Sequence, residues 1–233
     1  MKALSLCFAL LLALAVRAAE LNQLTPPEKM GGWTLLFNGH DLTGWRLYGK
    51  QAPPGEGWKV EAGILKKLAQ QKGGDIITTN QFNNYELVWE WRIAAGGNNG
   101  LKYLVTEARP GAPGQEYQML DDTGHPDGKI GPKRQTASFY DVLPPAQNKV
   151  LKPVGDWNTS RILVQGNHVE HWLNGAKVLQ FELGSELVKA AVAASKFKNA
   201  PKFGEKIEGH IMLTDHQDEA WFRNLKIRPL KVK

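Results

Sequence analysis

Short strand-like runs are the feature of this sequence that most restricts its possible folds. Many runs rich in aliphatic, aromatic and β-branched residues follow one another, and Gly, Pro, Asn and Asp separate them. In residues 168–181, HVEHWLNGAKVLQF, the dipeptide Asn174-Gly175 between two apolar runs predicts a two-residue hairpin turn. The whole pattern predicts an all-β sandwich or barrel.

The run at residues 85–93, YELVWEWRI, shows the alternation of a strand with one buried face. Every second residue is aromatic or aliphatic, whereas Glu86, Val88, Glu90 and Arg92 occupy the opposite face. Helical periodicity is scarce, and one short helix is predicted over residues 185–197, an Ala-rich segment followed by Asn199 and Pro201. No repeat or low-complexity linker divides the chain.

The first 18 residues have the pattern of an export signal. Lys2 precedes an apolar run that is short for a membrane span, and the small residues Val16 and Ala18 precede a predicted cleavage point. We therefore expect a signal peptide at 1–18, a single domain at 19–233, and a secreted or periplasmic protein without a membrane segment after cleavage. An uncleaved membrane anchor is the alternative.

The single cysteine, Cys7, lies in the predicted signal. The exported chain would have no disulfide and would depend on its core for stability. Loss of Lys2 and Arg17 would lower the formal net charge from +6 to +4, and the remaining basic residues are scattered among acidic ones. This pattern argues against nucleic-acid binding, and the oligomeric state stays open.

Residues 114–129, GQEYQMLDDTGHPDGK, combine a polar strand with an acidic turn. If Tyr117 and Met119 face the core, Glu116 and Gln118 face outward. The turn that follows is rich in Asp and contains a histidine, which are ligands for a divalent metal such as calcium, but a calcium-loop spacing is absent. Pro-Asp-Gly turns also form without metal, so no metal site or cofactor is predicted, and calcium is kept as an alternative.

Six blocks in order resemble one family. Residues 32–45, GWTLLFNGHDLTGW, are similar to the opening signature of the secreted bacterial 3-keto-disaccharide hydrolase domain. The similarity extends over about residues 31–230, and one departure is Asn99 where serine is usual. The later blocks are WKVEAGIL, NYELVWEWRIAAGGNNGLKYLV, GQEYQMLDD, GDWNTSRILVQGNHVEHWLNG and GHIMLTDHQDEAWFRNLKIRPL.

The resemblance implies a concanavalin-like jelly roll, in which two curved antiparallel sheets stack face to face and one outer face forms a groove. It also implies that six polar positions share this groove face. They are Glu90, Arg92, Lys102, Glu116, Gln118 and His171. Asp121 is expected at the rim of the groove and His216 at its edge.

The activity implied by the resemblance is cleavage of a glycosidic bond in a 3-keto-glycoside. The ketone acidifies the hydrogen on carbon 2, so a base can form an enolate that expels the substituent on carbon 1, and water then adds. His171 or Glu116 is the expected base, Lys102 or Arg92 the stabiliser of the enolate oxygen. Glu90 would orient Arg92 or act as the acid. The expected catalytic residues are thus Glu116, His171 and Lys102, and the expected substrate-binding residues are Glu90, Arg92, Gln118, Asp121 and His216.

Other interpretations of the same residues remain open. Glu90 with Arg92 could form only a cross-strand ion pair, and His171 and His210 could be structural. The whole protein could be a non-catalytic carbohydrate-binding module or a surface protein with a protein partner. A conventional glycoside hydrolase would need two carboxyl groups, for which Glu90 and Glu116 are candidates, although the Glu-x-Asp-x-x-Glu strand of jelly-roll endoglucanases is absent.

Overall fold

The computed structural model describes residues 21–231. The predicted signal peptide therefore lies outside the described residues. Within the described part, no helix has the length and apolar character needed to cross a membrane.

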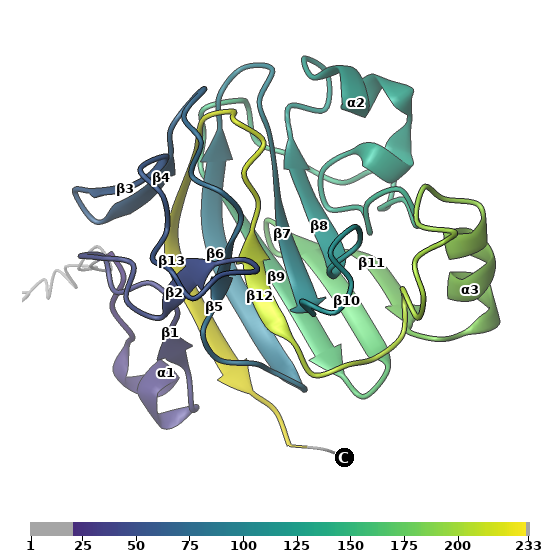
Figure 1. The fold of residues 1–233 in the computed structure, drawn as a ribbon, viewed down its shortest axis with the longest axis horizontal. Coiled ribbons are helices and arrows are strands. Elements are labelled where there is room, and N and C mark those ends of the chain that lie inside the picture. Colours follow the sequence, from purple (N-terminus) through teal and green to yellow (C-terminus); the bar gives the residue numbers. More distant parts are fainter. Residues whose placement is uncertain (1–20, 232–233) are drawn as a thin grey trace, which may run out of the picture.

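Two antiparallel sheets stacked against each other form the molecule (Figure 1). Within residues 21–231, sheet A contains, in spatial order, β11 (Ala176–Glu182), β10 (His168–Leu173), β9 (Asn158–Gln165), β6 (Tyr85–Ile93), β13 (Ala220–Pro229), β4 (Ile64–Lys67) and β3 (Trp58–Glu61), with β1 (Thr34–Leu35) paired to β13. Sheet B contains β2 (Trp45–Leu47), β5 (Ile76–Thr78), β12 (His210–Leu213), β7 (Asn98–Val105) and β8 (Gln115–Leu120). The predicted all-β sandwich is confirmed.

Strand β6 supplies the centre of the core. Its aromatic and aliphatic residues are buried, and the alternation predicted from YELVWEWRI is confirmed because Val88, Glu90 and Arg92 face outward and are only partly buried. Trp89 packs edge-on against Tyr117 of β8, with ring centroids 5.0 Å apart. Burying aromatic side chains from both sheets supplies much of the driving force that holds the sheets together.

The hairpin predicted at Asn174-Gly175 joins β10 to β11. Asn174 has φ +48° and Gly175 has φ +86°. Two successive positive φ angles are what a type I′ turn requires, and Asn-Gly adopts them at low cost.

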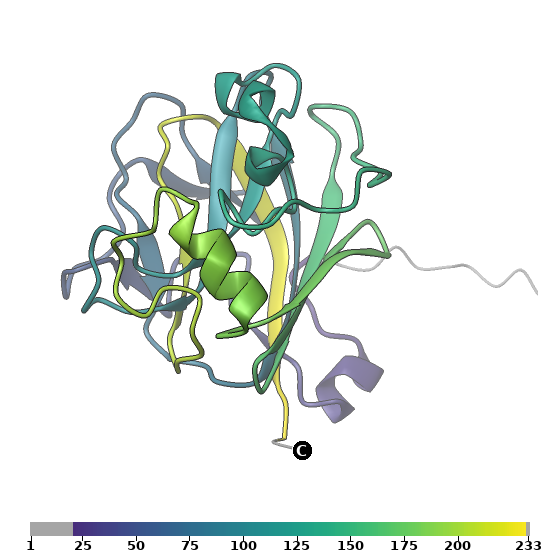
Figure 2. The same cartoon turned by 90° about the vertical axis from the view of Figure 1, so that its right-hand side faces the viewer.

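Helices lie outside the two sheets. They are α1 (Pro26–Met30), α2 (Pro126–Ile130) and α3 (Glu186–Ala193), with a 3₁₀ turn at Pro132–Arg134. Ser185 caps α3 by accepting a hydrogen bond from the N–H of Val188. The predicted helix is therefore confirmed, although it ends at Ala193, and the residues after it form a loop. In Figures 1 and 2 α3 lies beside β10 and β11, at the β8 side of the sandwich and away from β3 and β4.

Candidate functional site

The register of sheet B places a mixed row of side chains across its outer face. Arg46, Ile77, Met212, Lys102 and Glu116 are successive partners on β2, β5, β12, β7 and β8. The neighbouring row faces the core. It consists of Leu47, Ile76, Leu213, Leu101 and Tyr117. Because side chains alternate along a strand, the first row must face away from the core.

Glu116 lies at the end of this row among basic groups. Its carboxylate is 3.8 Å from Nζ of Lys102 and 3.9 Å from Nε2 of His216. Gln118 is the next outward residue on β8 and pairs with Gly100. We call Lys102, Glu116, Gln118 and His216 the Glu116 cluster.

Exposure differs sharply within the Glu116 cluster. The side chain of Glu116 is 6% exposed, that of Lys102 18%, and that of His216 40%. Gln118 is buried. A bound molecule would therefore meet His216 and Lys102 first, with Glu116 behind them.

Gly100 makes the space that Glu116 occupies. A Cβ atom at Gly100 would lie 2.0 Å from Oε1 of Glu116, so the carboxylate folds back over the glycine. The backbone of Gly100 is fixed because its N–H donates to Oγ1 of Thr214 at 2.8 Å and its carbonyl accepts from the N–H of Thr214. Thr214 is two residues before His216, so the same contact fixes the chain that carries the imidazole.

A buried ion pair fixes Asp215, the residue directly before His216. Nζ of Lys67 is 2.8 Å from Oδ1 of Asp215, and Lys67 is fully buried. The other oxygen of Asp215 accepts from the N–H groups of Gly73 and Gly74, at 2.7 and 2.8 Å. Breaking such a buried pair leaves an uncompensated charge, so the backbone beside His216 is tied to β4 and to the loop at Gly73 and Gly74.

The charges in the Glu116 cluster perturb one another. Burial favours the protonated form of Glu116, but Lys102, His216 and Lys196 outweigh burial and hold the pKa of this carboxyl below its usual range. Partial burial opposes the charge on His216, but Glu116 outweighs it and raises the pKa of the imidazole above its usual value. Glu116 is thus a carboxylate at neutral pH, and its charge favours the protonated form of His216.

A further lysine approaches Glu116 from the other edge of β8. The N–H of Tyr140 donates to the carbonyl of Glu116 at 3.0 Å, and Nζ of Lys196 lies 4.1 Å from the centre of the Tyr140 ring. Partial burial lowers the pKa of Lys196, and the carboxylates of Glu116 and Asp141 offset part of this effect. Since β7 and β12 lie on the opposite side of β8, Glu116 has Lys102 and His216 on one side and Lys196 on the other.

The Tyr140 segment is itself anchored by an acidic and basic network. The hydroxyl of Tyr140 donates to Asp127 at 2.5 Å. Arg134 binds Asp127 at 2.8 Å and Asp141 at 2.7 Å, and Asp141 accepts from the N–H of Lys196 at 2.7 Å. The turn predicted from its carboxylates therefore uses Asp127 to position Tyr140.

Sequence reasoning missed Lys196 and Tyr140. Neither belongs to a strand. Tyr140 lies between the 3₁₀ turn and β9 and donates to the carbonyl of Glu116, and Lys196 lies in the loop after α3 with its ammonium over the Tyr140 ring. The sequence placed Lys196 near the end of the predicted helix 185–197, where a single lysine carries no signal of a site. The one available hint is general, since loops positioned by a rigid scaffold often carry functional residues.

His171 does not lie on the outer face, and its predicted position there is wrong. The side chain is fully buried between the sheets, where Nδ1 donates to the carbonyl of Ala137 at 3.0 Å and Nε2 accepts from the hydroxyl of Tyr103 at 2.9 Å. Burial lowers the pKa of His171 to about 4. The imidazole is thus neutral, with both nitrogens satisfied inside the core.

Glu90 and Arg92 face outward as predicted, but on sheet A rather than beside Glu116. Glu90 accepts hydrogen bonds from Arg223 at 2.6 Å and Asn224 at 3.0 Å. The guanidinium of Arg92 stacks over the ring of Trp221 at 4.4 Å. Their predicted place in one groove with Glu116 is therefore wrong, and so is the geometry that a Glu90 and Glu116 carboxyl pair would need.

Asp121 organises the turn after β8. Its carboxylate accepts from the N–H groups of Gly96 at 2.9 Å and Gly124 at 2.8 Å, and from Thr123. These bonds lower the pKa of Asp121, with the bond from Gly96 contributing most.

His210, for which a structural role was the alternative, is buried, and its Nδ1 donates to the carbonyl of Thr78 at 2.7 Å. Across residues 21–231, no three His, Cys, Asp or Glu side chains are grouped to hold a metal ion.

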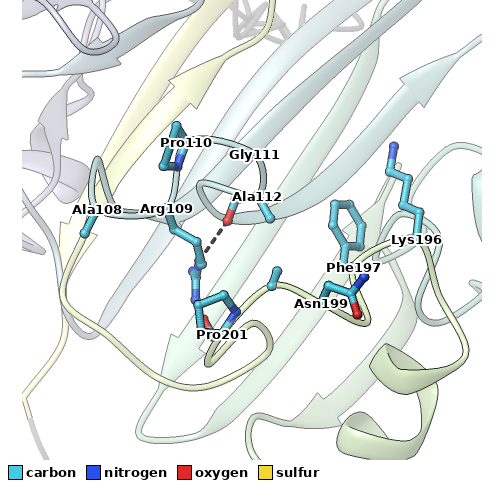
Figure 3. Close-up of a pocket in the computed structure, with 10 residues that line it drawn as sticks. Ala108, Arg109, Pro110, Gly111, Ala112, Lys196, Phe197, Asn199 and Pro201 are labelled. Atoms are coloured by element: carbon cyan, nitrogen blue, oxygen red, sulfur yellow. Dashed lines mark hydrogen bonds between the residues drawn. The ribbon is translucent and has the colours of Figure 1, made fainter.

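A pocket of about 390 Å³ is lined in part by Lys196, the lysine whose charge acts on Glu116 (Figure 3). Residues 108–112 form one wall, and residues from Lys196 to Pro201 form the other. The figure shows Arg109 reaching across from the first wall to Pro201.

Comparison with known proteins finds a family model and a relative whose names both refer to 3-keto sugars. Residues 32–228 match the family model described as the 3-keto-alpha-glucoside-1,2-lyase-like domain. A Bacteroides thetaiotaomicron protein named 3-keto-disaccharide hydrolase is 35% identical over 250 residues, which cover 93% of this chain and 84% of the relative.

Solved structures agree with that match. A crystal structure described as a candidate glycosyl hydrolase of Parabacteroides distasonis superimposes with a TM-score of 0.82 at 36% identity, covering 91% of this chain and 100% of that one. A second candidate glycosyl hydrolase of the same organism gives a TM-score of 0.66 at 25% identity, covering 85% and 99%. The two-sheet jelly-roll architecture is common to this chain and these structures.

Proposed function

Because the chain belongs to the 3-keto-alpha-glucoside-1,2-lyase-like domain family, we propose that it cleaves the glycosidic bond of 3-keto-glycosides. The observation that carries the proposal is an exposed histidine backed by a buried carboxylate and flanked by a lysine on the outer face of sheet B. The relative named 3-keto-disaccharide hydrolase supports a carbohydrate substrate.

We assign the base to His216. It is the most exposed member of the Glu116 cluster, and the carboxylate of Glu116 raises the pKa of its imidazole, which strengthens it as a proton acceptor. Glu116 holds the imidazole in place and stabilises its charge once it has taken the hydrogen from carbon 2. The ammonium of Lys102 would stabilise the enolate oxygen on carbon 3.

Lys196 would complete the step at carbon 1. It lies on the opposite side of Glu116 from Lys102 and His216, as carbon 1 lies on the opposite side of carbon 2 from the ketone. Its lowered pKa favours donation of a proton to the departing oxygen. The C2–H and C1–O bonds break, a C1–C2 double bond forms, and addition of water across it completes net hydrolysis.

Turnover of paired aryl glucosides, with and without the 3-keto group, tests this function. We expect release of the aryl alcohol only from the 3-keto substrate, and a loss of roughly 10²–10⁴-fold in kcat/KM for His216→Ala. His168→Ala is the matched control, because His168 also pairs with carboxylates and has a raised pKa but lies on sheet A. Sugar binding without turnover of either substrate would favour a carbohydrate-binding module instead.

We also propose that the chain is exported. The support is the basic start, apolar run and small residues of segment 1–18. Full-length protein expressed in a Gram-negative host should appear in the periplasm or medium with Ala19 as its first residue by N-terminal sequencing. Retention of residue 1 in a membrane fraction would indicate an uncleaved anchor.

A further inference from the structure

The pocket beside Lys196 has a lining that differs from that expected for a sugar. Its walls are mainly apolar, with two cationic side chains, one amide and no carboxylate. The lining residues are Ala108, Arg109, Pro110, Gly111, Ala112, Lys196, Phe197, Asn199, Ala200 and Pro201. Sugar hydroxyls need several hydrogen-bonding side chains, whereas an aromatic ring needs an apolar slot.

One wall of the pocket is a rigid aromatic ring. Phe197 stacks on Phe203 with ring centroids 4.2 Å apart and an interplanar angle of 20°. Phe203 in turn packs against Phe139. Nζ of Lys196 also lies 5.1 Å from the centre of the Phe197 ring. An aromatic occupant would therefore contact this ring beside the ammonium, without a large loss of side-chain freedom.

The pocket is preformed because Arg109 joins its two walls. The guanidinium donates to the carbonyl of Ala112 at 2.8 Å and to that of Pro201 at 3.0 Å (Figure 3). Arg109 is only 8% exposed, and its Nη2 has no hydrogen-bond partner among residues 21–231. Within that range no carboxylate lies within 4.0 Å of the guanidinium, although the more distant charge of Glu205 offsets part of the lowering of the pKa of Arg109 by burial.

The charge of the pocket favours an anionic occupant. The buried guanidinium of Arg109 gives a positive potential in surroundings of low dielectric, and the ammonium of Lys196 stands at the edge that adjoins Glu116. Negative charge develops on the phenolic oxygen as its bond to carbon 1 breaks and before Lys196 protonates it, so the guanidinium of Arg109 and the ammonium of Lys196 would both stabilise the departing group. The volume of about 390 Å³ falls within the usual range for small-molecule pockets, roughly 300–1,000 Å³.

We propose that this pocket is the leaving-group subsite and that it takes a phenolic aglycone in preference to a second sugar. The proposal rests on the proposed function for its role in turnover. Its binding chemistry can be tested without turnover, because the free aglycone should occupy the pocket alone.

The first experiment measures binding of free 4-hydroxybenzoate by calorimetry to the protein from Ala19 onward. Phe197→Ala should weaken binding roughly tenfold by removing the aromatic wall. Gly111→Trp should weaken it by filling the pocket, and the substitution is tolerable because no atom lies within 4 Å of a Cβ at Gly111. The control is Val154→Trp, an exposed residue of a different pocket, which should leave affinity unchanged.

The second experiment compares kcat/KM for a 4-carboxyphenyl 3-keto-glucoside and for a 3-keto-disaccharide. The wild type should prefer the aryl substrate, and Phe197→Ala should lower that preference roughly tenfold. Failure of wild type to bind 4-hydroxybenzoate, or an unchanged preference in Phe197→Ala, would overturn the subsite even if turnover persists. Binding that depends on Phe197 in a protein that turns over neither substrate would support the pocket and overturn only the proposed function.

Discussion

At the scale of single residues, the permanently charged member of the Glu116 cluster and its most exposed member are different residues. Glu116 carries the stable negative charge but is buried, whereas His216 is exposed and has a raised pKa because Glu116 favours its charged form. The two assignments of the base therefore predict different pH profiles. A histidine base would give an acid limb above pH 6.5, and a Glu116 base would give one below 4.5.

Glu116→Gln should move the acid limb of the kcat/KM profile to lower pH. The carboxylate raises the pKa of His216, so removing it lets the imidazole become neutral at lower pH. The plateau rate should fall roughly tenfold or more because the base is weaker and less well oriented. Profiles of wild type and variant between pH 4 and 9 give the answer. A wild-type limb below pH 4.5 would instead identify Glu116 as the base.

Alternation along a strand could have placed His171 correctly from the sequence. In HVEHWL the residue has the same parity as Val169 and Leu173, which are both buried. The family resemblance led to the prediction that His171 lies on the outer face, whereas the alternation of buried residues in this strand indicates that it faces the core. Lys196 could not have been found in the same way, because its distance to Glu116 depends on how the loop after α3 folds.

At the scale of elements, alternation indicates which face of a strand is buried but not which sheet the strand joins. Glu90 and Arg92 were assigned correctly to the outward face of β6. The sheet to which β6 belongs is decided by its pairing with β9 and β13, and these pairings span long separations in sequence. The Glu116 cluster was predictable in part because Lys102 and Glu116 lie on adjacent strands of one sheet.

Gly100 shows how the pairing of β7 with β8 positions a functional side chain. Gly100→Ala should lower kcat/KM at least tenfold, because the added methyl group must displace the Glu116 carboxylate. The fold should persist, since the atoms in conflict belong to the end of a flexible side chain, and Tm should fall only slightly. Met30→Ala, a control at an exposed position in α1, should change neither quantity. A Gly100→Ala enzyme with full activity would show that the position of Glu116 is unimportant.

At the scale of the whole molecule, His171 links the two sheets. It extends from β10 in sheet A to Tyr103 on β7 in sheet B, and it also holds the carbonyl of Ala137. The bond in which Nε2 accepts from the Tyr103 hydroxyl requires the neutral imidazole, whereas donation from Nδ1 to Ala137 does not. The sandwich therefore contains a titratable group at its centre that is separate from the Glu116 cluster.

This buried histidine should make the protein sensitive to acid. The pKa of His171 is about 4 in the folded protein and about 6.5 in an unfolded chain. As pH falls from 6.5 to 4, the unfolded chain binds a proton that the folded chain excludes. The free energy of unfolding therefore falls by roughly 3 kcal/mol because of His171. Above pH 6.5 the contribution is complete.

His171→Gln should remove this component of the pH dependence. The variant should be less stable than wild type at pH 7, by about 1–3 kcal/mol for the disturbed buried hydrogen bonds, and the difference should shrink as pH falls toward 4. Urea unfolding at pH 7 and pH 4.5 measures both effects. His40→Gln, at an exposed position, should follow wild type at both pH values. If His171→Gln keeps the wild-type loss of stability in acid, groups other than His171 cause it, and the link between the sheets is not the protein's acid-sensitive point.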